Sequence, residues 1–214
     1  MIKAIFWDND GVLVDTERYY FLATKNILKD AGIPLTKAQY IEMNLMQSRG
    51  ALQLAAEKGI AEAEIDRLRK VRNNLYSEYL HKKEIVISGV EKVLKSLRGK
   101  YTMGIVTSSR REHFEIIHNR TGFLRYFDFI IDHEQYKNSK PDPEPYLTAL
   151  KKVRLSPDKC VVIEDSPRGL AAALGAGIRC IVIPTSLTKT CDFSGAYKIA
   201  KTVSEIPAII KAIK

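Results

Sequence analysis

Residues 3–17 read KAIFWDNDGVLVDTE, and this stretch decides which fold the chain can adopt. The first five residues are mostly apolar, and the run stops at the triplet Asp8-Asn9-Asp10, followed by Gly11. A short apolar run that ends in polar residues and a glycine is typical of a buried strand that leads into a turn. Residues 3–7 are therefore predicted to form a buried strand that carries carboxylates at its end.

Four more apolar runs of this kind follow along the chain, at 101–106, 127–131, 159–163 and 178–183. Helical patterns separate them. Apolar residues recur at helical spacing after Gly89, prolines open a helix near residue 143, and Ser166-Pro167 opens another that ends at Gly177. Alternating strands and helices favour the α/β class, with a doubly wound parallel sheet that is covered by helices on both faces.

The stretch 15–83 interrupts this alternation, because it contains no convincing strand pattern. Helical patterns occur in it at 18–31, 36–46, 49–58 and 61–83. The chain is thus predicted to form one strand, leave for a helical insert, and return to complete the sheet. We assign residues 1–14 plus 85–214 to an α/β core and residues 15–84 to a helical domain that is inserted after the first strand.

The composition is that of an ordinary globular protein and disfavours several classes of protein. The chain has 214 residues, of which 45% are hydrophobic and 28% charged, with a net charge of +9. Its basic residues are spread along the sequence without interleaved aromatics, so nucleic acid is not expected as a partner. No apolar run approaches the roughly 20 residues of a membrane span, and the start lacks signal-peptide features. We expect a cytoplasmic protein, with no membrane partner, that is a monomer or a weak dimer.

Polar side chains follow four of the predicted strands. Asp8 and Asp10 follow the first, Thr107 and Ser108 follow the second, a loop after the third leads to Lys140, and Glu164 and Asp165 follow the fourth. The carboxyl ends of parallel strands meet at one edge of a sheet, which is where ligands bind. One polar strand end means little, but four such ends predict a crevice that gathers carboxylates, hydroxyls and one ammonium.

This set of side chains suits phosphoryl transfer. Clustered carboxylates repel one another, and Mg²⁺ relieves the repulsion because it prefers oxygen ligands and bridges carboxylates to phosphate. Asp8 and Asp165 are the candidate side-chain ligands, and Lys140 would hold a phosphate oxygen. The Thr107 hydroxyl and the Ser108 N–H would bind the remaining phosphate oxygens.

Two aspartates that lie two residues apart can divide the chemistry. Asp8 would attack phosphorus and form an aspartyl-phosphate. Asp10 would protonate the leaving oxygen and then deprotonate the attacking water.

The run from Asp8 to Glu17 resembles the first motif of the haloacid dehalogenase-like hydrolases, in the branch of β-phosphoglucomutase and small phosphatases for phosphoglycolate and sugar phosphates. Thr107-Ser108, Lys140-Pro141 and Glu164-Asp165 resemble its other three motifs, in the same order. The resemblance covers essentially the whole chain. It implies that the helical insert is a mobile cap over the site.

The resemblance also implies residue roles. Asp8 would be the nucleophile and Asp10 the acid/base, and Asp10 would also give Mg²⁺ its backbone carbonyl. Asp165 would bind the metal, and Thr107 and Lys140 would bind the phosphoryl group. For Glu164, which lies beside Asp165, direct ligation of the metal and a supporting role are equally good explanations.

Three positions refine the comparison with this family. Arg49 matches a cap arginine that holds a second phosphate in the mutases, and an ordinary helix-start residue is nearly as good an explanation of it. Tyr20 stands where β-phosphoglucomutases carry a histidine at the cap hinge, which disfavours mutase activity. Asn9 replaces a residue that is usually apolar, and we expect only its backbone to matter.

The sequence therefore predicts a Mg²⁺-dependent phosphatase that acts on a small phosphorylated metabolite. Two alternatives remain open, a β-phosphoglucomutase-like mutase and a non-catalytic regulator that binds a phosphorylated ligand. The cationic pair Arg110-Arg111 either meets an anionic substrate or is a solvated first turn of a helix.

Overall fold

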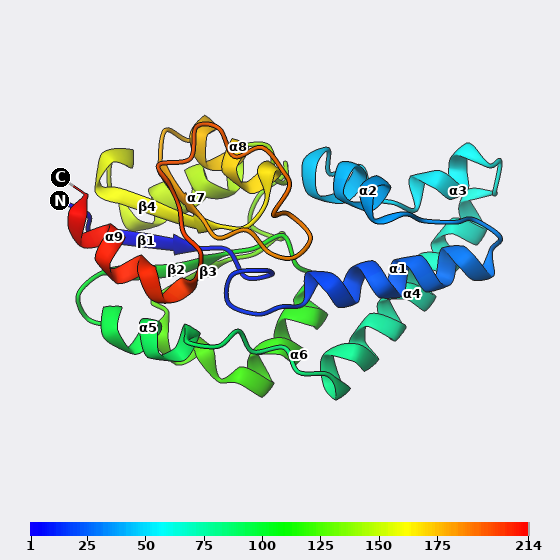
Figure 1. Ribbon diagram of the computed structural model, residues 1–214, viewed down its shortest axis with the longest axis horizontal. Coiled ribbons are helices and arrows are strands. Elements are labelled where there is room, and N and C mark those ends of the chain that lie inside the picture. Colours follow the sequence, from blue (N-terminus) through cyan, green and yellow to red (C-terminus); the bar gives the residue numbers. More distant parts are fainter. Residues whose placement is uncertain (214) are drawn as a thin grey trace.

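The computed structural model describes residues 1–213, and its centre is a six-stranded parallel sheet (Figure 1). The strand order is β3-β2-β1-β4-β5-β6, so the chain starts in the middle and winds outward in both directions. The strands are β1 (Ala4–Trp7), β2 (Thr102–Val106), β3 (Phe129–Ile131), β4 (Cys160–Glu164), β5 (Arg179–Val182) and β6 (Lys198–Ile199). The predicted doubly wound α/β fold is confirmed.

Helices cover both faces of the sheet, so the side chains of its central strands are buried on both sides. Apolar side chains of β1 alternate between the faces: Ile5 and Trp7 join one core cluster, and Ala4 and Phe6 join the other. The first cluster is closed by α5 (Val90–Leu97), α6 (Arg111–Thr121) and α9 (Ile206–Ala212), and the second by α7 (Glu144–Val153) and α8 (Pro167–Gly175). Figure 1 shows these two layers on opposite sides of the strands.

The sheet differs from the sequence prediction at its two edges. β3 begins at Phe129 because the preceding residues form a 3-10 turn, Phe123–Tyr126, which the Phe127 N–H closes by donating to Leu124 O. β6 was not predicted. It has two residues, both exposed, and so short an element carries no readable periodicity.

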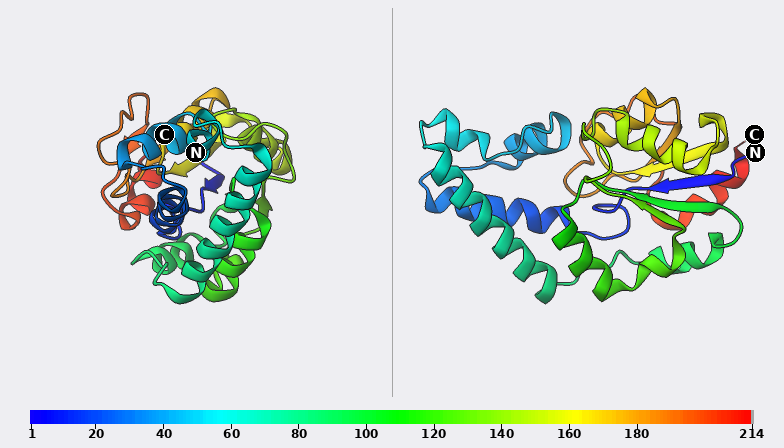
Figure 2. Two further views of the ribbon diagram at one scale, coloured as in Figure 1. Left: turned by 90° about the vertical axis from the view of Figure 1, so that its right-hand side faces the viewer. Right: turned by 180° about the vertical axis from the view of Figure 1, so that it is seen from behind.

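The stretch between β1 and α5 is helical, as predicted. It contains α1 (Glu17–Asp30), α2 (Lys37–Tyr40), a π-helical segment (Ile41–Met46), α3 (Gln53–Glu57) and α4 (Glu62–Lys82). The helix predicted at 49–58 is reduced to the short α3, since Gly50 has a φ of +77° and begins a turn. Figure 2 shows α1 leading away from the sheet and α4, which packs against α1, returning toward α6.

The insert has an apolar cluster of its own. Ile27 and Leu28 of α1 pack with Leu68 of α4 and with residues of the segments between them. One residue of the core, Leu187 in the loop after β5, joins this cluster. A smaller cluster that includes Val14 and Tyr76 lies at the junction. This arrangement suits a separate domain, and the boundaries at residues 14 and 85 stay a prediction. Within residues 1–213, no helix combines the length and apolar character that crossing a membrane requires.

Candidate active site

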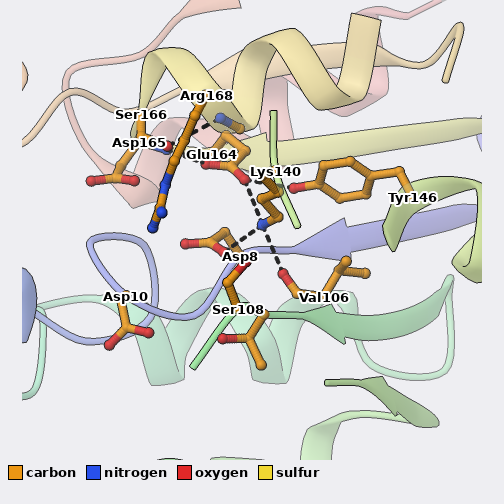
Figure 3. Close-up of polar contacts among 12 residues, drawn as sticks. Asp8, Asp10, Val106, Ser108, Lys140, Tyr146, Glu164, Asp165, Ser166 and Arg168 are labelled. Carbon is orange, nitrogen blue, oxygen red and sulfur yellow. Dashed lines mark hydrogen bonds and ion pairs between the residues drawn. The ribbon is translucent and has the colours of Figure 1, made fainter. Parts of the chain in front are cut away.

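The strand ends meet as predicted, at the edge of the sheet that faces the insert (Figures 1 and 3). Asp8 directly follows β1, and its N–H donates to Ile163 O over 2.9 Å, which extends the ladder between β1 and β4 by one residue. Glu164 is the last residue of β4, and Asp165 follows it. Because these two strands are neighbours in the sheet, their terminal carboxylates are brought together.

Lys140 joins this cluster from the loop that follows β3. Its ammonium donates to Asp8 Oδ1 over 2.6 Å, to Glu164 Oε1 over 2.7 Å and to Val106 O over 2.9 Å (Figure 3). The side chain is 2% exposed, so all three of its N–H bonds are used inside the protein. A buried ammonium with this coordination fixes the Asp8 carboxylate in one orientation.

Glu164 has a full set of hydrogen-bond donors. Its Oε1 also accepts from the Tyr146 hydroxyl over 2.7 Å, and its Oε2 accepts from the Asp165 N–H over 3.1 Å and from Ser166 Oγ over 3.3 Å. A Cβ added at Gly169 in α8 would collide with this carboxylate. Glu164 therefore supports the site by anchoring Lys140, and little of its hydrogen-bonding capacity is left for a metal ion.

Asp165, unlike Glu164, has a carboxylate oxygen without a hydrogen-bond donor among the described residues. Its Oδ2 is buried and has no hydrogen-bond partner within residues 1–213. It lies against Gly11, whose φ of +86° and lack of a Cβ allow the close approach. One carboxylate oxygen each from Asp8, Glu164 and Asp165 lies within 4.8 Å of the others. A buried carboxylate oxygen without a donor, beside two further carboxylates, fits an oxygen-liganded divalent cation.

The pKa values of the cluster indicate an excess of negative charge. Burial raises the pKa of Asp8 to about 7, with the Glu164 carboxylate adding to the effect and Lys140 opposing it. Burial, Glu164 and Asp8 hold the pKa of Asp165 well above its ordinary value. Burial would lower the pKa of Lys140, but Asp8 and Glu164 outweigh it and raise that pKa, so the ammonium stays charged. Three carboxylates thus outnumber the two cations near them, Lys140 and Arg168, a setting that favours a further cation.

Asp10 lies apart from these three carboxylates but lines the same cavity (Figure 3). Its Oδ1 accepts a hydrogen bond from the Thr16 hydroxyl, and its Oδ2 accepts one from the Ser109 hydroxyl and one from the Asn9 amide. Asp8 and Asp10 therefore face the same cavity from two different positions.

The two residues of the predicted phosphate-binding motif, Thr107 and Ser108, differ in whether they reach the cavity. Ser108 lines the cavity, and its hydroxyl contacts the Tyr136 hydroxyl at 3.3 Å. Thr107 is fully buried: its N–H donates to Ile131 O, and its Oγ1 accepts from the Ser109 N–H over 3.0 Å. Thr107 is not among the described residues that line the cavity.

The cavity has a volume of about 260 Å³ and includes a cation that the sequence analysis missed. Arg168 in the first turn of α8 extends toward Asp165 and Asp8, and its Nη1 donates to Ser48 Oγ over 3.2 Å (Figure 3). Ser48 in turn donates to Lys140 O over 2.6 Å, which connects the insert to the core. Arg168 lies in the first turn of α8, three residues after Asp165, and a basic residue so close to the fourth motif was the available signal.

A second cavity of about 300 Å³ adjoins the first and shares Tyr20, Gly50 and Arg110 with it. The structure places Arg49 here rather than in the first cavity, exposed and donating to Gln47 Oε1 over 2.8 Å. The cavity has a cationic lining, which consists of Arg49, Arg69, Arg72 and Arg110 against the single carboxylate of Glu62. The sequence analysis did not single out Arg69 and Arg72 as site residues.

Arg72 is the least exposed of these arginines, at 7%. Its Nε donates to Asn73 Oδ1 over 3.0 Å, and its guanidinium lies 4.6 Å from the centre of the Tyr20 ring. No carboxylate of residues 1–213 lies within ion-pair distance of Arg72 or Arg110. Burial lowers the pKa of Arg72, and the nearby Arg110 and Arg69 add to this effect against the opposing influence of Tyr20.

Comparison with known proteins gives a consistent result. Residues 5–183 match the family model of the haloacid dehalogenase-like hydrolases. A phosphorylated carbohydrates phosphatase of Thermotoga maritima is 35% identical over 181 residues, which cover 83% of this chain and 82% of that protein. The β-phosphoglucomutase of Bacillus subtilis is 30% identical over 185 residues, which cover 83% and 81%.

Solved structures agree with this family. A variant of CbbY from Rhodobacter sphaeroides in complex with xylulose-1,5-bisphosphate matches with a TM-score of 0.80 at 25% identity, over 94% of this chain and 95% of that chain. The family model spans far more than half of the sequence and includes all four strand-end motifs. The chain therefore belongs to the haloacid dehalogenase-like hydrolases.

Proposed function

We propose that this protein is a Mg²⁺-dependent phosphatase that hydrolyses a small phosphorylated metabolite, of the phosphoglycolate or sugar phosphate class, through an aspartyl-phosphate on Asp8. The observation that carries the proposal is the buried cluster of Asp8, Glu164 and Asp165 around the single ammonium of Lys140. A phosphate dianion would be repelled by such a cluster unless a divalent cation joined it.

Asp8, Asp165 and the backbone carbonyl of Asp10 would hold the cation. The donor set is made of oxygens only, and the unpartnered Oδ2 of Asp165 supplies a free ligand atom. When bound, Mg²⁺ neutralises charge on the phosphoryl oxygens and holds the phosphate against the carboxylates. The hydrogen bonds of Glu164 to Lys140 and Tyr146 support a role in holding Lys140 rather than in binding the metal.

In the first step, a carboxylate oxygen of Asp8 attacks phosphorus while the bond from phosphorus to the ester oxygen breaks. Asp10 gives its proton to the departing oxygen, so an alcohol leaves and an aspartyl-phosphate remains. Lys140 keeps Asp8 oriented and balances charge that develops on the phosphoryl oxygens, and Ser108 at the cavity wall holds one of those oxygens.

In the second step, water attacks the phosphorus of the aspartyl-phosphate, and Asp10 accepts the proton of that water. The acyl-phosphate bond breaks with its electron pair returning to the Asp8 carboxylate, and inorganic phosphate leaves. The helical insert, residues 15–84, would act as a cap during both steps, since the Ser48 contact with Lys140 already joins it to the core.

The arginine-lined cavity favours substrates that carry a second anionic group. Arg72 and Arg110 are cations without a carboxylate partner among the described residues, and Arg110 lines both cavities. A phosphate or carboxylate at the far end of the substrate would supply the missing counter-charge and offset the burial of Arg72. Xylulose-1,5-bisphosphate, which carries two phosphates, is bound by CbbY, a protein of similar fold.

The test is a phosphate-release screen. Phosphorylated metabolites with and without a second anionic group are incubated with the protein after treatment with EDTA, then with Mg²⁺ restored. We expect release only with Mg²⁺ and a preference for the doubly anionic substrates. Full activity in a thoroughly demetallated sample would contradict the metal requirement.

A mutase is the competing function, because the β-phosphoglucomutase of B. subtilis is a relative. Both activities begin with phosphorylation of an aspartate, so the next attacking group separates them. Tyr20 lies with its ring 5.1 Å from that of Tyr76, and burial raises the pKa of its phenol, so it stays protonated near neutral pH. A histidine at this hinge position would instead be able to change charge near neutral pH.

The two functions are separated by supplying β-glucose 1-phosphate with catalytic glucose 1,6-bisphosphate and following both products. We expect water to discharge the intermediate, so that free phosphate is released. Formation of glucose 6-phosphate much faster than free phosphate would assign the protein to the mutases.

A further inference from the structure

Asn9 is a buried amide between the two aspartates of the first motif. Its side chain is 0% exposed. An amide in such a place costs free energy unless its oxygen and its nitrogen both find partners. The structure departs from the expectation that only the backbone of Asn9 matters, because both ends of the side chain are hydrogen-bonded.

A directed chain of hydrogen bonds runs through Asn9 from the C-terminal end of α6 to Asp10. Thr121 Oγ1 lies 3.4 Å from His118 Nδ1, and His118 Nε2 lies 3.0 Å from Asn9 Oδ1. Asn9 Nδ2 donates to Asp10 Oδ2 over 3.2 Å. One arrangement of protons satisfies every link: the Thr121 hydroxyl donates to Nδ1, the Nε2–H donates to Asn9, and the amide NH₂ faces Asp10.

The state of His118 fixes the direction of this chain. Its side chain is 3% exposed and its ring lies 4.3 Å from that of Phe114. Burial lowers the pKa of His118 to about 4, with the Asp10 carboxylate opposing the effect, so the imidazole is neutral near pH 7 and carries a single N–H. With Nδ1 engaged by Thr121, that proton lies on Nε2 and sets the orientation of the Asn9 amide.

Asp10 is also held by two hydroxyls, those of Thr16 and Ser109. Hydroxyl groups rotate freely and accept as readily as they donate, whereas the Asn9 amide is locked at both ends. Asn9 thus supplies a fixed donor to Asp10 Oδ2, and His118 supplies its orientation. Neither Asn9 nor His118 is among the described residues that line the 260 Å³ cavity. A direct contact with substrate therefore does not explain their pairing.

We propose that His118 and Asn9 are positioning residues that orient the Asp10 carboxyl group for proton transfer to the leaving group. The proposal rests on the function proposed above for Asp10 and deepens it. It predicts a defect in proton transfer with little change in substrate binding, which a role in packing alone does not predict.

The test compares two substrates that differ in how much their leaving group needs a proton. The nitrophenolate of p-nitrophenyl phosphate departs readily without one, and the more basic phenolate of phenyl phosphate does not. We measure kcat and KM for both with Mg²⁺, in Asn9→Leu, His118→Phe and His118→Gln. His81→Phe, at an exposed histidine in α4, is the matched control. Gln keeps an N–H donor at His118, and Phe keeps the ring shape without a donor.

Asn9→Leu and His118→Phe are expected to lower kcat/KM for phenyl phosphate about 10- to 100-fold, a part of the full effect of a general acid. On p-nitrophenyl phosphate they should lose less than about 3-fold, with KM nearly unchanged in both cases. His118→Gln is expected to recover most of the loss. An equal loss on both substrates, unchanged kinetics, or no difference between Gln and Phe would each overturn the proposal.

Asp10→Ala separates this proposal from the one on which it rests. If Asp10→Ala keeps its activity, the proposed function of Asp10 fails. If Asp10→Ala is inactive while the other variants behave like wild type, only the positioning proposal fails. Thermal unfolding shows which variants fold, and the two His118 substitutions test the proposal even if Asn9→Leu does not.

Discussion

The two cavities described above differ in whether their charged side chains are paired with opposite charges of the protein. In the core, Asp8 and Glu164 share the ammonium of Lys140, and further donors of the fold bind both carboxylate oxygens of Glu164. On the side of the insert, Arg72 and Arg110 face a cavity without any ion-pair partner among residues 1–213. The carboxylates of the core are thus held by the fold, whereas the arginines of the second cavity offer positive charge that an anionic group of a substrate would balance.

The largest effect is expected from removal of the nucleophile in the core. Asp8→Asn should lower kcat by about three orders of magnitude or more, because it removes the attacking oxygen and a metal ligand together. Phosphate release in single-turnover and steady-state assays measures this loss. A folded variant that retains more than a small fraction of the wild-type rate would contradict the covalent mechanism.

Breaking the core ion pairs should affect both activity and stability. Lys140→Met keeps the length of the side chain but leaves the Asp8 and Glu164 carboxylates buried without their ammonium, a change that typically costs about 3–5 kcal/mol. We expect kcat/KM to fall by about two to three orders of magnitude as well. Urea unfolding and phosphate release measure the two effects, and an unchanged free energy of unfolding would show that the pair stabilises nothing.

The core should respond to pH, and the arginine cavity should not. Without metal, Asp8 has a pKa raised to about 7, so it gains a proton as the pH falls through that value. A protonated carboxyl group binds Mg²⁺ poorly, so the apparent Kd should rise about tenfold or more for each pH unit below 7, and the raised pKa of Asp165 adds to this rise. Calorimetric titration with MgCl₂ between about pH 6 and pH 8 measures this. A Kd that does not change over this range would contradict the raised pKa.

The smallest effect is expected in the insert. Arg72→Ala should raise KM about tenfold for substrates with a second anionic group and leave singly phosphorylated substrates nearly unchanged, since a charge-assisted contact is worth about 1.5–3 kcal/mol at most. Arg67→Ala is the matched control, because Arg67 lies on the same helix, pairs with Glu64 and is 68% exposed. Equal changes in KM for both kinds of substrate would show that the cavity does not select by charge.

The sequence by itself determined the sheet and the members of its reactive edge. Each strand is a short apolar run with a polar end, and parallel strands place their carboxyl ends together, so Asp8, Lys140 and Asp165 could be grouped before any coordinates. The short β6 could not be predicted in this way, because a periodicity argument needs more than two residues.

The tertiary structure alone decided how those residues are used. His118 and Asn9 are 109 positions apart, and Arg110 reaches the arginines of α4 only because the insert folds back over the sheet edge. Thr107 is turned into the core and Glu164 is surrounded by donors, although the motif pattern gives no sign of either. Local periodicity reports which face of an element is buried, whereas the partner of a buried polar group depends on which distant segments pack against it.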